Sequence, residues 1–330
     1  MLLPAYQAAE TLGLALESVA RQRFRDWECV IVDDGSTDAT RALASSRARV
    51  DPRFRLLARE HAGLVPALSA GLAECRGRFV ARMDADDIMH RERLALQHAA
   101  LARDPCLAGV GCHVRLFPRS RLTDGRVAYE RWLNSVRDAG DVFRDRFIEC
   151  PIAHPTFFFR REALSGLGYR DLGWPEDYDL VLRLLAAGER VGVVPRRLLG
   201  WRDAPGRLSR THAAYALGRF VACKAHFIAS DFLRGHASYV LWGYGDTGRA
   251  LSKSLAALGL HPTHIVEVHP GRIGQRVRGA PVIAPDALAT LAPRPTRIVA
   301  SVAGPTPRRE IREKLASLGF VELRDFVVAA

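Results

Sequence analysis

The sequence predicts an α/β protein in which a mostly parallel sheet is flanked by helices, followed by a smaller α/β domain. Three observations lead to this prediction. Short apolar runs alternate with longer helical patterns through the first hundred residues, as they do where helices join parallel strands. Two acidic clusters directly follow apolar runs, at the strand ends where such sheets bind ligands. A second β-α-β pattern begins at Ser238.

The first part of the chain alternates strands and helices. The segment 29–32 reads CVIV, and an unbroken apolar run of this kind predicts a strand that is buried on both faces. Leu12, Leu16 and Val19 recur at helical spacing, which predicts an amphipathic helix over 10–21. The same criteria predict strands at 2–4, 54–58 and 79–83, and helices from about Thr37, at 64–75 and at 91–103.

The pattern is less regular from Cys106 to about Trp201. We expect strands at 110–117, 156–159 and 190–194 and a helix at 178–187. One long amphipathic helix is predicted over 211–233 as a connector, because Leu217, Val221 and Ile228 fall on one stripe. The predicted organisation is a first domain at 1–210, a connecting helix at 211–235 and an α/β domain at 236–330.

Composition limits the function classes. The 330 residues suit one large domain and a small one, and the chain has no apolar run near the roughly 18 residues of a membrane span. Met1 leads straight into periodic sequence without a secretory signal, so we expect a cytoplasmic protein. The six cysteines show no CxxC pair and no metal-ligand spacing, which favours buried reduced thiols.

The net charge is +12, from 48 basic and 36 acidic residues, and nearly all the basic residues are arginine. This excess favours anionic partners such as phosphates or acidic lipid headgroups. The arginines are scattered along the chain, with no dense basic tract interleaved with aromatic residues. Nucleic acid is therefore not expected as a partner.

The first acidic cluster is VDDGSTDAT at 32–40. Asp33 and Asp34 leave a buried strand, Gly35 permits a tight turn, and Ser36 or Thr37 could cap the following helix. An acidic turn of this kind can be purely structural. Alternatively, one carboxylate accepts hydrogen bonds from a nucleotide base or ribose.

The second cluster, MDADD at 83–87, places Asp84, Asp86 and Asp87 at a strand end. Three carboxylates repel one another there and lose hydration, so they need a compensating cation. Oxygen ligands of this kind suit Mg²⁺ or Mn²⁺. The alternative is a solvated acidic loop that precedes the next helix.

A third acidic segment, GWPEDYDLVLRLLAAG at 173–188, opens a helix. Acidic residues in a first helical turn are favoured by the helix dipole, which is the structural interpretation. The functional interpretation is that Asp177 or Glu176 acts as a general base on an incoming hydroxyl.

The C-terminal part contains GYGDTG at 243–248, directly after a predicted strand and at the start of a helix. Gly243, Gly245 and Gly248, with Glu267 at the end of the next strand, fit the spacing of a dinucleotide-binding loop. The domain is about half the size of a full dinucleotide fold. A docking role therefore stays open beside nucleotide binding.

Four segments together resemble a known family: LPAYQAAETL at 3–12, DDGSTD at 33–38, DADD at 84–87 and EDYDLVLR at 176–183. Their order is that of glycosyltransferase family 2, and the resemblance covers about residues 1–210. It implies the GT-A nucleotide-diphospho-sugar transferase fold and inversion at the anomeric carbon. The C-terminal part resembles the small Rossmann-like domains appended to some sugar-modifying enzymes.

The resemblance also implies roles for individual residues. Asp84 and Asp86 match the DxD motif, with Asp86 as the direct metal ligand, and Asp177 matches the catalytic base. The residues that would line the nucleotide pocket are Pro4, Tyr6, Asp33 and Asp34.

The sequence departs from the family pattern at two points. Gln7 stands where the family usually has Asn. In WRDAPGRLSR at 201–210, Ala204 stands where a His often follows the Arg, so we expect no His metal ligand there. By the same resemblance His154 and Arg202 lie on the acceptor side, although a lone His before Pro is also typical of a structural residue.

The sequence therefore predicts a metal-dependent inverting glycosyltransferase that uses Mg²⁺ or Mn²⁺. Its donor would be a nucleoside diphosphate sugar and its acceptor a hydroxyl of a glycan or lipid-linked glycan. The arginine excess would allow peripheral association with the anionic inner face of the membrane. Two alternatives are a nucleotidyltransferase acting on sugar phosphates and a nicotinamide-dependent oxidoreductase that uses the C-terminal glycine loop.

Overall fold

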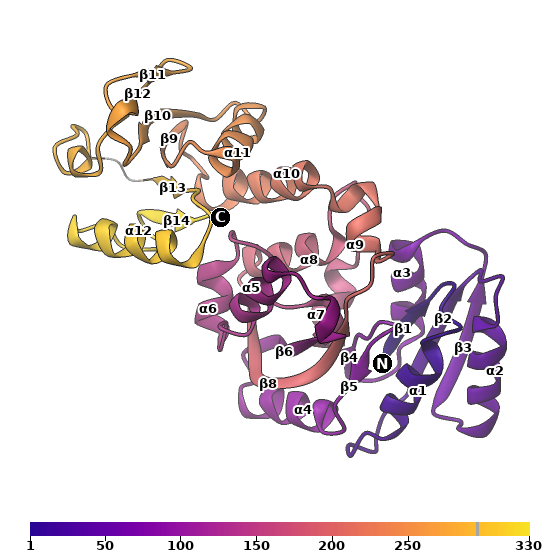
Figure 1. Ribbon diagram of the computed structural model, residues 1–330. Coiled ribbons are helices and arrows are strands. Elements are labelled where there is room, and N and C mark those ends of the chain that lie inside the picture. The colour runs from indigo at the N-terminus through magenta and orange to yellow at the C-terminus, as the bar shows by residue number, and fades with distance from the viewer. Residues whose placement is uncertain (295–296) are drawn as a thin grey trace. The chain divides into compact units, whose positions relative to one another are not determined.

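The computed structural model describes residues 1–294 and 297–330, which form two compact units (Figure 1). The first unit comprises Met1–Phe143, Pro151–Leu172 and Asp179–Arg207. The second comprises Arg144–Cys150, Gly173–Tyr178 and Leu208–Ala330. Both units combine strands and helices, which confirms the α/β class, and the domain bounds expected from the sequence stay a prediction.

The first unit opens with a parallel three-stranded sheet in the order β1-β2-β3. Its strands are β1 (Leu2–Ala5), β2 (Cys29–Asp34) and β3 (Phe54–Arg59), and its helices are α1 (Leu12–Ala20), α2 (Thr40–Val50) and α3 (Leu64–Glu74). All six residues of β2 are buried, as the CVIV run predicts. Helix α3 approaches the sheet at Gly71, where a Cβ would lie 2.3 Å from Leu2 Cδ1. A glycine is therefore needed for this close packing.

A five-stranded sheet follows in the order β4-β7-β6-β8-β5. Its strands are β4 (Phe79–Ala81), β5 (Ile88–Met89), β6 (Leu107–Phe117), β7 (Phe158–Arg160) and β8 (Arg190–Arg202). The long strands β6 and β8 pair in parallel, whereas the other pairings in this sheet are antiparallel. Leu2 forms an isolated parallel bridge with Arg82, so the end of β4 adjoins β1. The segment after β4 is the acidic DADD cluster, which therefore lies beside the first sheet.

Helix α4 (Arg93–Arg103) packs against β6 and β8. The other helices in this part of the chain are η1 (Arg119–Arg121), α5 (Asp124–Leu133), α6 (Ala139–Asp145), η2 (His154–Thr156), α7 (Arg161–Leu167) and α8 (Glu176–Ala186). Cys106 is exposed and the other cysteines are buried. Within the described ranges, no helix is both long enough and apolar enough to cross a bilayer.

The second unit contains a six-stranded sheet in the order β11-β12-β10-β9-β13-β14. The strands are β9 (Ser238–Trp242), β10 (His261–Val266), β11 (Arg276–Val277), β12 (Ala280–Ile283), β13 (Ile298–Ala300) and β14 (Phe326–Val328). All pairings are parallel except that of β11 with β12. Its further helices are α11 (Asp246–Ala256), η5 (Pro270–Arg272), η6 (Pro285–Ala289) and α12 (Pro305–Ser317).

The single helix predicted over 211–233 is wrong. The segment consists of α9 (Leu208–Thr211), η3 (Ala213–Tyr215), α10 (Leu217–Phe227) and the π-helix η4 (Ile228–Phe232). His212 and Ala216 adopt extended backbone angles, with ψ of 137° and 142°. The His212 ring also accepts a hydrogen bond from the Ala214 amide, which competes with helical bonding and explains the first break.

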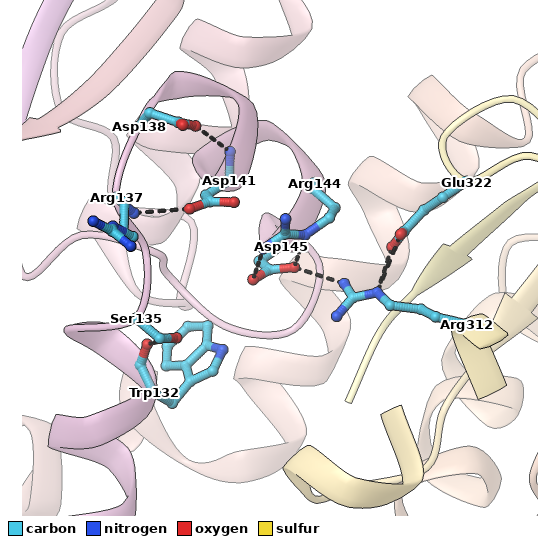
Figure 2. A network of polar contacts seen from close by, with 9 residues as sticks. All are labelled: Trp132, Ser135, Arg137, Asp138, Asp141, Arg144, Asp145, Arg312 and Glu322. Atoms are coloured by element: carbon cyan, nitrogen blue, oxygen red, sulfur yellow. Dashed lines mark hydrogen bonds and ion pairs between the residues drawn. The ribbon is translucent and has the colours of Figure 1, made fainter. Parts of the chain in front are cut away.

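Buried and half-buried polar contacts hold residues 144–150 within the second unit. The Arg312 guanidinium of α12 donates to Asp145 at 2.7 Å and to Glu322 at 2.8 Å (Figure 2). The buried Lys224 ammonium donates to the carbonyls of Ile148 at 2.9 Å and Ala329 at 2.6 Å. This short segment is therefore fixed by residues far along the chain.

Candidate active site

The three carboxylates that follow β4 come together, as the sequence predicts. Oxygens of Asp84, Asp86 and Asp87 lie within 4.8 Å of one another. Asp87 is fully buried and the other two are half-buried. The strand end thus concentrates negative charge in a poorly hydrated place, which is costly without a cation.

Burial shifts the protonation of this cluster. Loss of hydration, together with the neighbouring Asp84, raises the pKa of Asp86 to about 6. The pKa of Asp87 is raised well above its usual range by burial and by the other two carboxylates. Asp87 Oδ1 accepts the Arg202 amide at 2.8 Å, whereas its buried Oδ2 has no hydrogen-bond partner among the described residues. Oxygen donors of this number and type fit Mg²⁺ or Mn²⁺, so the three residues are candidate ligands for such an ion.

Two arginines offset part of this charge. Arg82 Nη2 lies 2.5 Å from Asp84 Oδ1, and its side chain is buried. Burial alone would raise the pKa of Asp84, but Arg82, with help from Arg207, lowers it. The sequence analysis missed both arginines. For Arg82 a signal existed, because residues two apart in an extended segment point to the same side.

Arg202, expected on the acceptor side, adjoins the acidic cluster. Its Nε donates to the Asp86 carbonyl at 2.7 Å, and its amide donates to Asp87. His154 is buried in η2, where its Nε2 lies 3.0 Å from the Tyr169 hydroxyl. His154 also lowers the pKa of Asp84, although burial, Arg82 and Arg207 each affect this pKa more strongly. The His154 ring therefore lies within electrostatic range of the cluster.

The second group of residues lies at the end of β2. The buried Asp34 carboxylate accepts a hydrogen bond from the Gly63 amide at 2.8 Å. Its Oδ2 also lies 2.8 Å from His61 Nδ1. The Tyr6 ring, 48% exposed, stacks on the His61 ring at 4.1 Å between centroids. Pro4 is buried on β1, opposite Val32 in the sheet register. His61 was not predicted, because its role depends on contacts distant in sequence.

Asp33 is also buried, and its carboxylate accepts Arg41 Nε at 2.7 Å and the Ser36 amide at 3.3 Å. Gly35 has a φ of 74°, which confirms the tight turn. The prediction that Ser36 or Thr37 caps α2 is wrong, because α2 begins at Thr40. Their hydroxyl oxygens instead accept hydrogen bonds from Gln7, from its amide and its Nε2 respectively.

Glu176 and Asp177 open helix α8, as the acidic first turn predicts, and both belong to the second unit. Glu176 is 3% exposed and accepts a 2.5 Å hydrogen bond from the Tyr215 hydroxyl. Asp177 is half-buried, and its Oδ1 accepts the Tyr178 amide at 2.8 Å. Asp177 is therefore the more accessible carboxylate of the pair.

The glycine loop GYGDTG connects β9 to α11 in the second unit. Gly243 has a φ of 91°, and a Cβ on Gly248 would lie 2.0 Å from the Gly243 carbonyl. Gly245 precedes the first residue of α11. The Tyr244 amide donates to Glu267 at 2.8 Å, so a carboxylate already accepts one loop amide. Backbone packing thus accounts for Gly243 and Gly248, and nucleotide binding at this loop stays a prediction.

One protein family and several individual proteins are similar to this chain in sequence. The family described as "Glycosyl transferase family 2" matches residues 1–168. The succinoglycan biosynthesis protein ExoO of Rhizobium meliloti is 30% identical over 246 residues, which cover 71% of this chain and 68% of ExoO. The bifunctional glycosyltransferase pgtA of Dictyostelium discoideum is 28% identical over 48% of this chain, and the match spans 24% of pgtA.

Two solved structures share the fold. The mannosyltransferase PcManGT from Pyrobaculum calidifontis, in complex with GDP-Man and Mn²⁺, matches 97% of this chain and 79% of its own, with a TM-score of 0.53 and 20% identity. TarS residues 1–349 of S. aureus, in complex with UDP-GlcNAc, match 77% of this chain and 70% of their own, with a TM-score of 0.55 and 16% identity. Both structures support the GT-A-like fold.

Proposed function

The chain belongs to glycosyl transferase family 2 and is a glycosyltransferase, and from this premise we propose a metal-dependent, inverting reaction. A sugar would pass from a nucleoside diphosphate donor to a hydroxyl of a glycan or lipid-linked acceptor. The observation that carries the proposal is the Asp84, Asp86 and Asp87 cluster, whose crowded and partly buried carboxylates a bound cation would stabilise.

Mg²⁺ or Mn²⁺, when bound, would stabilise the negative charge of the departing diphosphate. Asp86 would hold the ion directly and Asp84 would support it. The Arg82 guanidinium already offsets part of the negative charge of Asp84. The cluster would therefore repel an anionic donor less than three unpaired carboxylates would. PcManGT, which shares the fold, was solved with Mn²⁺, and this supports the choice of metal.

The Tyr6 and His61 pair would receive the nucleotide base. A half-exposed aromatic ring stacked on a second ring offers a flat apolar surface to a base. The neighbouring Asp33 and Asp34 carboxylates could accept hydrogen bonds from base or ribose donors. The related folds TarS and PcManGT bind UDP-GlcNAc and GDP-Man, which supports a nucleotide sugar donor without choosing the base.

Asp177 would take the proton from the acceptor hydroxyl as that oxygen attacks the anomeric carbon. The new glycosidic bond forms on the face opposite the leaving diphosphate, so the configuration inverts. Glu176 is buried against Tyr215 and is less suited to this step. We therefore assign Asp177, and not Glu176, as the general base.

The acceptor would be presented at an anionic membrane face. The net charge of +12 favours such a surface. In the second unit Leu208 is 46% and Leu217 is 75% exposed, close in sequence to the exposed Arg219. Exposed leucines beside a basic residue suit the headgroup region of a bilayer. ExoO is described as a succinoglycan biosynthesis protein, which is consistent with a glycan acceptor.

A thermal-shift screen tests the donor and metal together. UDP, GDP and their sugars are added to the full chain with Mn²⁺ or with a chelator, and Asp86→Asn is measured in parallel. We expect one nucleotide to stabilise the wild type in the presence of Mn²⁺ and to have little effect on the variant. If the nucleotide stabilised the wild type and Asp86→Asn equally, and did so in the chelator as well as in Mn²⁺, the proposed metal site would be contradicted.

A further inference from the structure

The acidic start of α8 is fixed by the C-terminal part of the chain. Tyr215 lies in η3, and its hydroxyl donates to Glu176 Oε2 at 2.5 Å. Glu176 is 3% exposed, so this hydrogen bond to a carboxylate forms away from water. Hydrogen bonds to charged groups are about twice as strong as neutral ones, and a hydrogen bond is electrostatically stronger in the protein interior than in water.

The residue on the other side of Asp177 is fixed as well. Tyr178 is fully buried, and its ring stacks on Phe220 of α10 with centroids 4.6 Å apart and planes 7° apart. Its hydroxyl donates to the Arg146 carbonyl at 2.6 Å. Arg146 in turn forms an ion pair with Asp231 at 3.1 Å.

Asp177 therefore sits between two anchored neighbours. A peptide has two soft dihedral angles per residue, so fixing the residues before and after Asp177 restricts where its carboxylate can point. One anchor is a buried ring stack that any large apolar contact could supply. The other is a specific hydrogen bond from a single hydroxyl, and it can be removed with little change of shape.

We propose that Tyr215 is a positioning residue for the catalytic base, acting on Asp177 through Glu176. The inference rests on the proposed role of Asp177. Tyr215 lies beyond residues 1–168, which the family match covers, and it belongs to the second unit. The C-terminal part of the chain thus takes part in the transfer step by orienting the base.

The test uses Tyr215→Phe in the full chain, with Tyr239→Phe as the matched control. Tyr239 is a buried tyrosine of β9 in the same unit, so the control also removes one phenol hydroxyl from the interior. We expect Tyr215→Phe to lower kcat about 10-fold to 100-fold with the donor KM unchanged, because the base acts on the acceptor. Tyr239→Phe should leave kcat unchanged.

A double-variant cycle with Glu176→Gln separates positioning from general loss of structure. If Tyr215 acts through Glu176, the double variant is no slower than the slower single variant, because each single variant already removes the charge-assisted hydrogen bond between the two side chains. Equal kcat in Tyr215→Phe and Tyr239→Phe would overturn the inference, and so would multiplicative effects in the double variant. Absence of any sugar transfer by the wild type would instead overturn the proposed function on which it rests.

Discussion

Replacing Asp86 with Asn should stabilise the metal-free protein and destabilise the metal-loaded one relative to wild type. The reason is the environment of the carboxylate. Asp86 is half-buried beside Asp84 and Asp87, with oxygens of all three within 4.8 Å. Without a cation, the ionised group is penalised by burial and by its neighbours, whereas an amide carries no charge to penalise.

The magnitude follows from the pKa shift. The pKa of Asp86 rises from 3.8 to about 6 in the fold, because burial and Asp84 disfavour the charged form. An acid whose folded pKa is raised costs stability above that pKa, and the cost disappears below the unfolded value. At pH 8 the ionised group therefore costs about 1–3 kcal/mol. Removing it should raise the Tm by about 2–10 °C.

The assay is thermal unfolding of wild type and variant at pH 8, in a chelator and in Mn²⁺. In the chelator the variant should melt higher at pH 8, and the difference should shrink as the pH falls from about 6 to about 4, between the folded and unfolded pKa values of Asp86. In Mn²⁺ at 1,000 times its Kd the order should reverse, because bound ligand then adds about 4.1 kcal/mol to the protein that binds it, which exceeds the cost of the ionised group. A variant that melts lower than wild type in the chelator would refute the reasoning.

Three further predictions concern other parts of the molecule. Tyr6→Ala should raise the Kd of the nucleoside diphosphate about 10-fold, because it removes the stacking surface beside His61; calorimetry with an unchanged Kd would exclude a base site there. Burial lowers the pKa of Lys224 to about 8, so the unfolded chain holds more protons than the folded one above that pH. The stability of wild type relative to Lys224→Met, measured by urea unfolding, should therefore rise by about 2–3 kcal/mol from pH 7 to 10, and a flat or falling difference would contradict the assignment. Co-sedimentation with acidic liposomes should fall steeply as salt rises past physiological strength, whereas equal binding to neutral liposomes would count against a charged membrane surface.

Local sequence patterns predicted the parts of the fold that depend on local chemistry. The apolar run before Asp33 forms a buried strand, and the acidic residues at 176 and 177 open a helix. Asp84 and Asp86 fall at a strand end because the preceding apolar residues end there. In each case composition and spacing alone determine the local structure.

The remaining features depend on contacts between distant residues. Tyr6 and His61 are 55 positions apart, and Tyr215 and Glu176 are 39 apart. Periodicity shows which side of an element is buried, but it does not show which distant side chain lies against it. The break at His212 has a different cause, because its ring takes a backbone hydrogen bond that the apolar stripe does not reveal.

The most direct test of the central claim is product analysis with nucleotide sugars and Mn²⁺, with water as the acceptor. We predict release of the nucleoside diphosphate, loss of this release in a chelator, and a rate on the order of 10²–10⁴-fold lower for Asp177→Asn at unchanged donor affinity. Glu176→Gln should be affected less than Asp177→Asn. Release of pyrophosphate, or an Asp177→Asn variant as fast as the wild type, would contradict the account.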